Sequence, residues 1–280
     1  MGKGRIIGKL NNPSADSASG VWNLREQCNA RKNTDNIVWP VNEIVTSGLI
    51  LHLDAGNSAS YPGSGTTWTD LSGSGYNFTV QSGSWVSAGA ASYFNFGGSF
   101  CCAKRVVGGV LTDVPAVANG TIMVFSSILN STANWRTLTR GAAAAGDHQV
   151  LIQQTSNILG MYDNTLPAAF ISNVFDVSTI LNYTTKLNCL YWKLSTSSPY
   201  YAFGHNKVIS AGTDITNVNA TFNNGFASIG GNHNNNTTVT SSTNASQYWG
   251  NIGVFLYYNR HLTNVEILQN YNALKRRYDI

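Results

Sequence analysis

From residue 48 onward, short apolar runs alternate with clusters of Gly, Ser, Thr and Asn, and this spacing restricts the fold more than any other feature. Each run has the length of a β-strand. The runs are LILHL at 49–53, SYFNF at 92–96, TIMVFSSIL at 121–129, HQVLIQQ at 148–154, NILGMY at 157–162, LNCLYWKL at 187–194, YYAFG at 200–204, FASIGG at 226–231 and NIGVFLYY at 251–258. Many strands joined by turn residues, with almost no helix, predict an all-β, two-sheet antiparallel jelly-roll sandwich.

The alternation of side chains within the first and last runs predicts which residues face the core. Leu49, Leu51 and Leu53 share one face, because successive side chains of a strand point to opposite sides. In the last run, Phe255 and Tyr257 share one face. The predicted opposite face of that run holds Ile252, Val254, Leu256 and Tyr258.

The C-terminal segment LTNVEILQNYNALKRRYDI has the one strong helix signal. Thr263 and Glu266 form a Thr-x-x-Glu capping box, and apolar residues follow at helical spacing. The basic triplet at 275–277 would lie in the last turn, where positive charge is favourable for the helix dipole. A helix over 263–278 is therefore predicted, and stability explains it without any ligand.

Residues 1–46 differ from the rest of the chain. A polar, turn-rich stretch precedes VWNLREQCNARK, which is compatible with a short helix that ends before the proline of IVWP. The large apolar side chains of this segment have little local core to enter. The candidates for contact with another surface are Trp22, Leu24, Arg25 and Trp39. We therefore predict an extended N-terminal anchoring arm over 1–46 and a jelly roll over 47–280.

The charge balance argues against several classes of partner. Charged residues make up 11% of the chain, against about 25% in typical soluble proteins, and the basic residues behind the formal charge of +4 concentrate near the two ends. No basic stripe interleaved with aromatic residues crosses the middle, so nucleic acid is not expected as a partner. The N-terminal residues lack the apolar region of a signal peptide, and no apolar run reaches the roughly 18 residues of a membrane span. The cysteines, without disulfide or CxxC spacing, are predicted to be reduced thiols.

Motifs of nucleophilic, metal-dependent and phosphate-binding catalysis are absent from the sequence. Glycoside hydrolysis requires two carboxylates about 5–10 Å apart. Glu26 and Glu43 fall in the arm, and Glu266 caps the predicted helix. Asp54 and Asp70 are the best pair by position, yet each follows directly on a strand end. We therefore expect a protein that is not an enzyme and needs no cofactor.

The stretch from residue 54 to residue 85 contains the candidates for a ligand site. Asp54 and Asp70 offer the hard oxygen ligands that calcium prefers. The aromatic rings on which a sugar could stack are Tyr61, Trp68, Tyr76 and Trp85. In the structural alternative, the two aspartates accept backbone N–H groups in Asx-turns, while Trp68 and Leu71 pack into the end of the sandwich. We favour this alternative for both aspartates and for Trp68.

Two stretches of the sequence resemble a known family. GLILHLDAGNSASYPGSGTTWTDLSGSGYNFTV, at 48–80, and WGNIGVFLYYNRHLTNVEILQNYNALKRRY, at 249–278, resemble the opening and closing parts of laminin-G-like, concanavalin-A-like jelly-roll domains. The version that they resemble occurs in virion proteins of tailed bacteriophages, notably marine ones. The segment ASGVWNLREQCNARKNTDNIVWP is similar to a short segment of phage appendage proteins.

This resemblance implies a usually non-enzymatic module that serves for recognition or decoration and that often binds calcium or glycans at one rim. Asp54 and Asp70 are candidate positions, without a complete ligand set. The expected function is that of a virion structural protein on the particle surface, either as a capsid decoration or head fibre or as a tail fibre or appendage adhesin, with the arm bound to other virion proteins.

Such a protein would be made in the host cytoplasm and would act as a homo-oligomer, with a trimer expected. Multivalency would strengthen its weak contacts with host surface polysaccharide. The alternatives are a free carbohydrate-binding lectin and a glycoside hydrolase.

Overall fold

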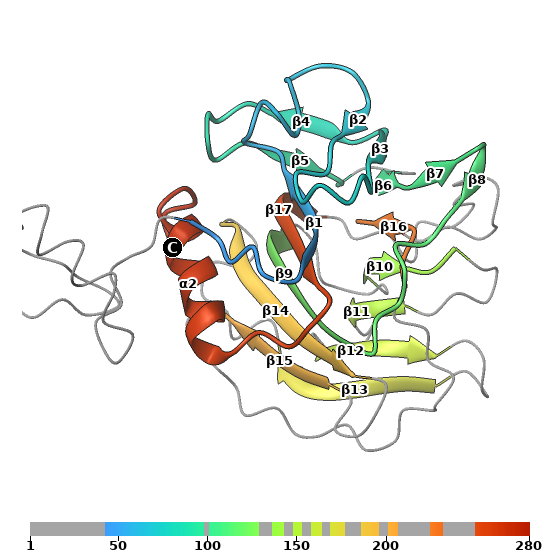
Figure 1. Cartoon of the computed structure of the whole chain (residues 1–280), viewed down its shortest axis with the longest axis vertical. Coiled ribbons are helices and arrows are strands. Elements are labelled where there is room, and N and C mark those ends of the chain that lie inside the picture. The colour runs from blue at the N-terminus through green and yellow to red at the C-terminus, as the bar shows by residue number, and fades with distance from the viewer. Residues whose placement is uncertain are drawn as a thin grey trace, which may run out of the picture.

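The computed structural model describes residues 43–97, 101–128, 136–142, 148–152, 158–163, 169–176, 186–195, 201–206, 225–231 and 250–280. Two large antiparallel sheets pack face to face, and a C-terminal helix covers the outer side of one of them (Figure 1). The predicted β-sandwich with a C-terminal helix is therefore confirmed. Residues 1–42, with Trp22, Leu24, Arg25 and Trp39, lie outside the described residues, so the arm stays a prediction.

The first sheet is built around β17, which pairs with β9 on one side and with β1 and β5 on the other. Its order is β15-β14-β9-β17-β5-β4, with β1 alongside the second half of β17. The bounds are β1 (Leu49–Asp54), β4 (Ser84–Val86), β5 (Tyr93–Asn95), β9 (Asn119–Ile128), β14 (Asn188–Ser195), β15 (Tyr201–His205) and β17 (Gly250–Tyr258).

The second sheet has the order β13-β12-β11-β10-β16-β6-β3-β2. The bounds are β2 (Thr67–Trp68), β3 (Phe78–Gln81), β6 (Cys102–Lys104), β10 (Arg136–Arg140), β11 (His148–Ile152), β12 (Ile158–Asp163), β13 (Ala169–Asp176) and β16 (Ser228–Ile229). A separate hairpin of β7 (Val106–Val107) and β8 (Val110–Leu111) projects from the sandwich beside β6 (Figure 1).

The core between the sheets is rich in aromatic side chains. Phe226, beside β16, packs against Phe255 and Tyr257 of β17, with ring centroids 5.5 and 5.4 Å apart. Trp192 of β14 and Leu138 of β10 are fully buried in the same cluster. Burial of each such side chain contributes about 1.5–3 kcal/mol, so this apolar layer is the main stabilising feature of the sandwich.

β17 contains a bulge that reverses the predicted facing of Ile252. Its pairing with β9 shifts register between Ile252 and Val254, so Gly253 is an extra residue in the strand. Ile252 therefore joins Phe255 and Tyr257 between the sheets, while Val254 packs on the outer side under the helix. The prediction that Ile252 and Val254 share a face is wrong, because strict alternation does not anticipate a bulge.

β1 also contains a register shift, at its beginning, that reverses the predicted facing of one residue. Its register with β17 shifts between Leu49 and Leu51. Leu51 and Leu53 face the core as predicted, but Leu49 packs against the cluster on the outer face, so its predicted facing is wrong.

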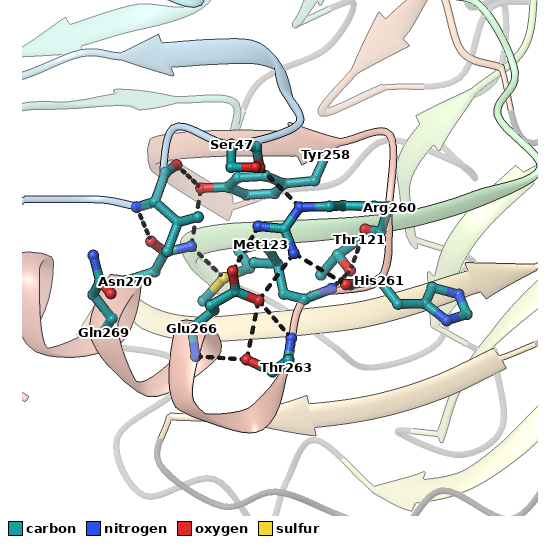
Figure 2. Close-up of polar contacts among 12 residues, drawn as sticks. Ser47, Thr121, Met123, Tyr258, Arg260, His261, Thr263, Glu266, Gln269 and Asn270 are labelled. Carbon is teal, nitrogen blue, oxygen red and sulfur yellow. Dashed lines mark hydrogen bonds and ion pairs between the residues drawn. The ribbon is translucent and has the colours of Figure 1, made fainter. Parts of the chain in front are cut away.

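The helix α2 (Asn264–Lys275) begins at the predicted capping box. Glu266 N donates to the Thr263 hydroxyl at 3.3 Å, and the Glu266 carboxylate accepts from Thr263 N at 2.8 Å (Figure 2). The same carboxylate forms an ion pair with Arg260, with Nη2 to Oε1 at 2.6 Å. Hydrogen bonds from Arg260, followed by those from Thr263, lower the pKa of Glu266 to about 2.

A buried polar network fastens the beginning of the domain to α2 (Figure 2). The Asn270 side-chain oxygen accepts from Val45 N at 2.7 Å, and its Nδ2 donates to the Tyr258 hydroxyl at 3.0 Å and to Met123 Sδ at 3.2 Å. The Tyr258 hydroxyl in turn donates to Val45 O at 2.9 Å. The segment at 43–47 is therefore held where the predicted arm joins the sandwich.

Two further sequence predictions have an outcome in the described residues. Cys101, Cys102 and Cys189, predicted to be reduced thiols, are buried and form no disulfide with one another, and burial raises the pKa of Cys102 to about 12. Cys28 lies outside the described residues. Within the part of the chain that the structure describes, no helix combines the length and the apolar character that a bilayer crossing requires.

Candidate functional site

The loop after β1 is folded tightly by its own polar groups. Ser60 N and Tyr61 N both donate to Asn57 O, at 2.9 and 2.8 Å. The Ser60 hydroxyl accepts from Asp54 N at 3.0 Å and donates to Thr69 O at 2.6 Å. These short-range bonds make the loop rigid and direct Tyr61 inward, so the Gly- and Ser-rich sequence is explained by turns.

Tyr61 and Trp85 form an aromatic pair at this edge of the sandwich. Their ring centroids are 5.6 Å apart, and Tyr61 also packs edge-on against Phe94 at 4.8 Å. Tyr61 donates its hydroxyl to Gly65 O at 2.8 Å, and Trp85 Nε1 donates to Ala55 O at 3.1 Å. Both rings are therefore fixed in position before any ligand arrives, which reduces the entropy lost on binding.

A pocket of about 250 Å³ lies between the loop after β1 and the loop that follows β4. We call it the rim pocket. Its lining consists of Ala55, Gly56, Ser58, Tyr61, Pro62, Gly63, Trp85, Ser87, Gly89 and Ser92. The Ser92 hydroxyl donates to Gly89 O at 2.7 Å and accepts from Ala88 N at 2.9 Å, so this wall is also ordered locally.

Glycine shapes two walls of the rim pocket. Gly63 has a φ of +91°, and a Cβ there would lie 3.3 Å from the Trp85 ring, so glycine lets the loop rest on the indole. A Cβ on Gly56 would collide with Ala90 O and lie 2.6 Å from Arg277 Nη2. Larger residues at either position would close or distort the pocket.

Asp54 forms a buried ion pair with Arg277, behind the wall of the rim pocket that contains Gly56. Arg277 Nη1 and Nη2 donate to its two carboxylate oxygens at 2.8 and 2.6 Å, and Gly56 N donates to Oδ1 at 2.9 Å. Arg277 Nε also donates to Ala90 O at 2.7 Å. Only 5% of the Asp54 side chain and 19% of the Arg277 side chain are exposed. The pair links the C-terminal end to both walls of the rim pocket.

Asp70 organises a second loop through hydrogen bonds. Its Oδ1 accepts from His52 N at 2.9 Å and from Ser72 N at 2.8 Å. Its Oδ2 accepts from the Ser72 hydroxyl at 2.9 Å and from Tyr76 N at 3.1 Å. The bond from Ser72 N has the Asx-turn geometry of the structural alternative.

His52 on β1 lies near both aspartates: its Nε2 is 4.0 Å from Asp54 Oδ2, and its backbone N donates to Asp70 Oδ1. Burial lowers its pKa, and the charges of Asp54 and Asp70 oppose that shift. Among the described residues, no three His, Cys, Asp or Glu side chains gather as a metal-binding group would. The geometry therefore gives the two aspartates structural partners.

The remaining two aromatic candidates are placed away from the rim pocket lining. Trp68 is fully buried and packs against Phe94 at 4.8 Å, so it has no ring face open to a sugar. Tyr76 is partly buried, and the Arg105 guanidinium covers its ring at 4.9 Å. Leu71, predicted to pack inward, is partly buried. Of the four predicted rings, Tyr61 and Trp85 come together in one pocket.

Sequence reasoning missed the role of Arg277 and of the loop at 87–92. Arg277 was expected to act on the helix dipole, but the helix ends at Lys275 and Arg277 turns back to Asp54. The two partners are 223 residues apart in the sequence, and no local pattern identifies such a pair. The Ser and Gly residues after β4 could have been noted only as turn residues.

Comparisons with known proteins identify the fold. No family model and no curated protein matches this chain. Among solved structures, the binding domain of botulinum neurotoxin serotype C1 has a TM-score of 0.52 at 16% identity, over 82% of this chain and 53% of that one. The ligand-binding domain of serotype D, solved with N-acetylneuraminic acid, has a TM-score of 0.50 at 16% identity, over 81% and 51%.

A mutant sialidase of Trypanosoma rangeli that displays trans-sialidase activity is also similar. Its TM-score is 0.51 at 13% identity, over 83% of this chain and 34% of the sialidase. The chain thus spans between a third and about half of the structures that it matches. At these identities the likeness shows the fold alone, a two-sheet antiparallel β-sandwich.

Proposed function

We propose that this protein is a non-catalytic carbohydrate-recognition module whose sugar site is the rim pocket. The observation that carries the proposal is the fixed Tyr61–Trp85 pair on its lining. Aromatic faces beside a few hydroxyl and backbone groups suit a sugar, which has an apolar ring face and polar edges. The serotype D neurotoxin domain, with the same fold, was solved with a bound sugar, which supports this choice of ligand class.

The engagement of the carboxylates supports a role without catalysis. Most glycoside hydrolases use one carboxylic acid and one carboxylate that face the same bond. Asp54 is paired with Arg277, Asp70 accepts four hydrogen bonds, and Glu266 caps α2. Each of these groups has a structural task that sugar cleavage would disrupt.

A glycan array and saturation-transfer NMR test this proposal. The wild-type protein should bind a subset of glycans, and Trp85→Ala should weaken that binding at least tenfold, because buried aromatic contacts dominate recognition sites. Binding should persist in chelator, since Asp54 and Asp70 already have protein partners. Tyr76→Ala is the matched control: it removes a partly buried ring of the same rim that lies outside the pocket, and it should leave binding unchanged.

Two results would contradict the proposal. Loss of binding in Tyr76→Ala but not in Trp85→Ala would place the site elsewhere. Release of reducing ends from a polysaccharide, abolished by Asp70→Asn, would indicate a hydrolase.

The module is further proposed to belong to the surface of a tailed-bacteriophage particle, as a capsid decoration or a tail appendage. The resemblance of residues 48–80 and 249–278 to the virion version of the fold supports this placement, together with the arm-like segment before it. The arm would bind other virion proteins through Trp22, Leu24, Arg25 and Trp39. Display as an oligomer, with a trimer expected, would raise the avidity of weak sugar contacts.

Electron microscopy of particles labelled with antibody against residues 47–280 tests this placement. Label on capsid or tail is expected, and particles that lack label while the protein stays free in the lysate would favour a free lectin instead. A chain without residues 2–46 should fail to join the particle, whereas normal incorporation would exclude the arm as anchor.

A further inference from the structure

The lining of the rim pocket is uncharged. It consists of the partly buried ring of Trp85, the buried Tyr61 that packs against it, the exposed hydroxyl-bearing residues Ser58 and Ser87, and main-chain groups of glycine and alanine. Sugar hydroxyls can exchange hydrogen bonds with such groups. A carboxylate or sulfate placed there would give up its water without gaining a cationic partner.

The cation behind the pocket wall is already neutralised. Arg277 lies against Gly56, but both of its terminal nitrogens donate to Asp54 and its Nε donates to Ala90 O. An acidic sugar would have to compete with Asp54, which is pre-positioned and nearly fully buried. Breaking a buried ion pair is strongly unfavourable, so Arg277 is a poor receptor for an incoming anion.

The volume of the pocket is enough for about one sugar ring, and the rest of a glycan would lie outside it. Its size of about 250 Å³ is below the range of about 300–1,000 Å³ of pockets for drug-sized molecules. A hexose has about 12 non-hydrogen atoms, and ordinary ligand efficiencies give such a molecule a dissociation constant near the millimolar level.

We infer that the rim pocket accepts one neutral pyranose residue of a glycan and discriminates against sialic and uronic acids. The inference rests on the proposed function and specifies its ligand class. It separates this chain from the serotype D neurotoxin domain, whose structure contains N-acetylneuraminic acid. Neutral sugars should bind at least tenfold more tightly than acidic ones, through contact with Trp85.

Titration of the ¹⁵N-labelled full chain by NMR tests this inference. The probes are methyl glycosides of glucose, galactose and mannose, N-acetylglucosamine, glucuronic acid and N-acetylneuraminic acid, each added to 20 mM at constant pH and ionic strength. The reporter is the Trp85 indole N–H, assigned by its loss in Trp85→Phe. A second variant, Ser87→Arg, adds a cation to the exposed pocket wall and should raise the affinity for the acidic sugars several-fold.

The outcomes separate the inference from the function on which it rests. Saturable shifts of the Trp85 signal with a neutral sugar, and weaker shifts with the two acidic sugars, support the inference and the proposed function. Equal or tighter binding of an acidic sugar at Trp85 overturns the inference and leaves sugar recognition standing. If the Trp85 signal responds to none of the six sugars, the proposed function falls with it.

Discussion

Replacing Asn270 by leucine should destabilise the domain more than an ordinary substitution on a helix. The variant keeps a similar volume but removes the acceptor of Val45 N–H, whose bond at 2.7 Å is buried. An unsatisfied buried donor costs about 1–3 kcal/mol, and loss of the bond to the Tyr258 hydroxyl adds about 1 kcal/mol. The expected loss is about 2–4 kcal/mol, which lowers Tm by roughly 5–15 °C in a domain of this size.

Gln269→Leu is the matched control, because Gln269 neighbours Asn270 on α2 (Figure 2). It also bonds the entering segment. Its Nε2 donates to Glu43 O at 3.1 Å from an exposed position, so its loss should change the free energy of unfolding by less than about 0.5 kcal/mol. Urea unfolding gives the stabilities, and amide exchange should show that Val45 loses protection in Asn270→Leu alone. An Asn270→Leu protein within 0.5 kcal/mol of the wild type would refute the argument from the buried network.

Three further changes test other parts of the structure. Asp54→Asn should destabilise the domain by about 3–5 kcal/mol in urea unfolding, because Arg277 would keep a largely buried charge without its counter-ion. The pKa of Glu266 is lowered from 4.5 to about 2, so its contribution to stability is present above pH 4.5 and is lost as the pH falls toward 2. Thermal scans of wild type and Glu266→Gln should therefore differ at pH 6 and converge near pH 2. Gly253→Ala should cost about 1–3 kcal/mol, because the added Cβ would collide with the Tyr278 hydroxyl; calorimetry measures it.

Each of these changes has an outcome that would contradict its reasoning. Asp279→Asn is the control for Asp54→Asn: it breaks an exposed ion pair with Lys186 and should leave the urea midpoint unchanged. If both variants lost the same free energy of unfolding, burial of the Asp54–Arg277 pair would not explain the effect. A constant difference between wild type and Glu266→Gln from pH 6 to pH 2 would show that the carboxylate charge is not responsible. A Gly253→Ala protein of wild-type stability would mean that β17 relaxes freely at its bulge.

The elements with local signals were predictable from the sequence. The capping box of α2 depends on two residues three positions apart, so Thr263 and Glu266 identify the start of the helix. The strand runs are recognised by composition and by the turn residues between them, and β1, β9 and β17 all lie where the runs place them. The facings of Ile252 and Leu49 could not be predicted, because a bulge is stabilised by the neighbouring strand and not by the strand itself.

The candidate site was only partly predictable for a related reason. Tyr61 and Trp85 could be named as rings from composition, and so could Trp68 and Tyr76. Nothing in the sequence distinguishes the two rings on the pocket lining from the one in the core or the one under Arg105. That distinction depends on which segments fold beside one another.

The amino-acid sequence by itself determined the class of fold and the start of the capped helix α2, because hydrophobic periodicity, turn residues and capping act over a few residues. It also marked the aspartates of the rim as turn formers, since Asx-turns are local. Only the tertiary structure decided that Arg277 neutralises Asp54 from the far end of the chain and that Trp85 meets Tyr61 in a small uncharged pocket. These contacts arise from the packing of distant segments, and that packing sets what the rim pocket can bind.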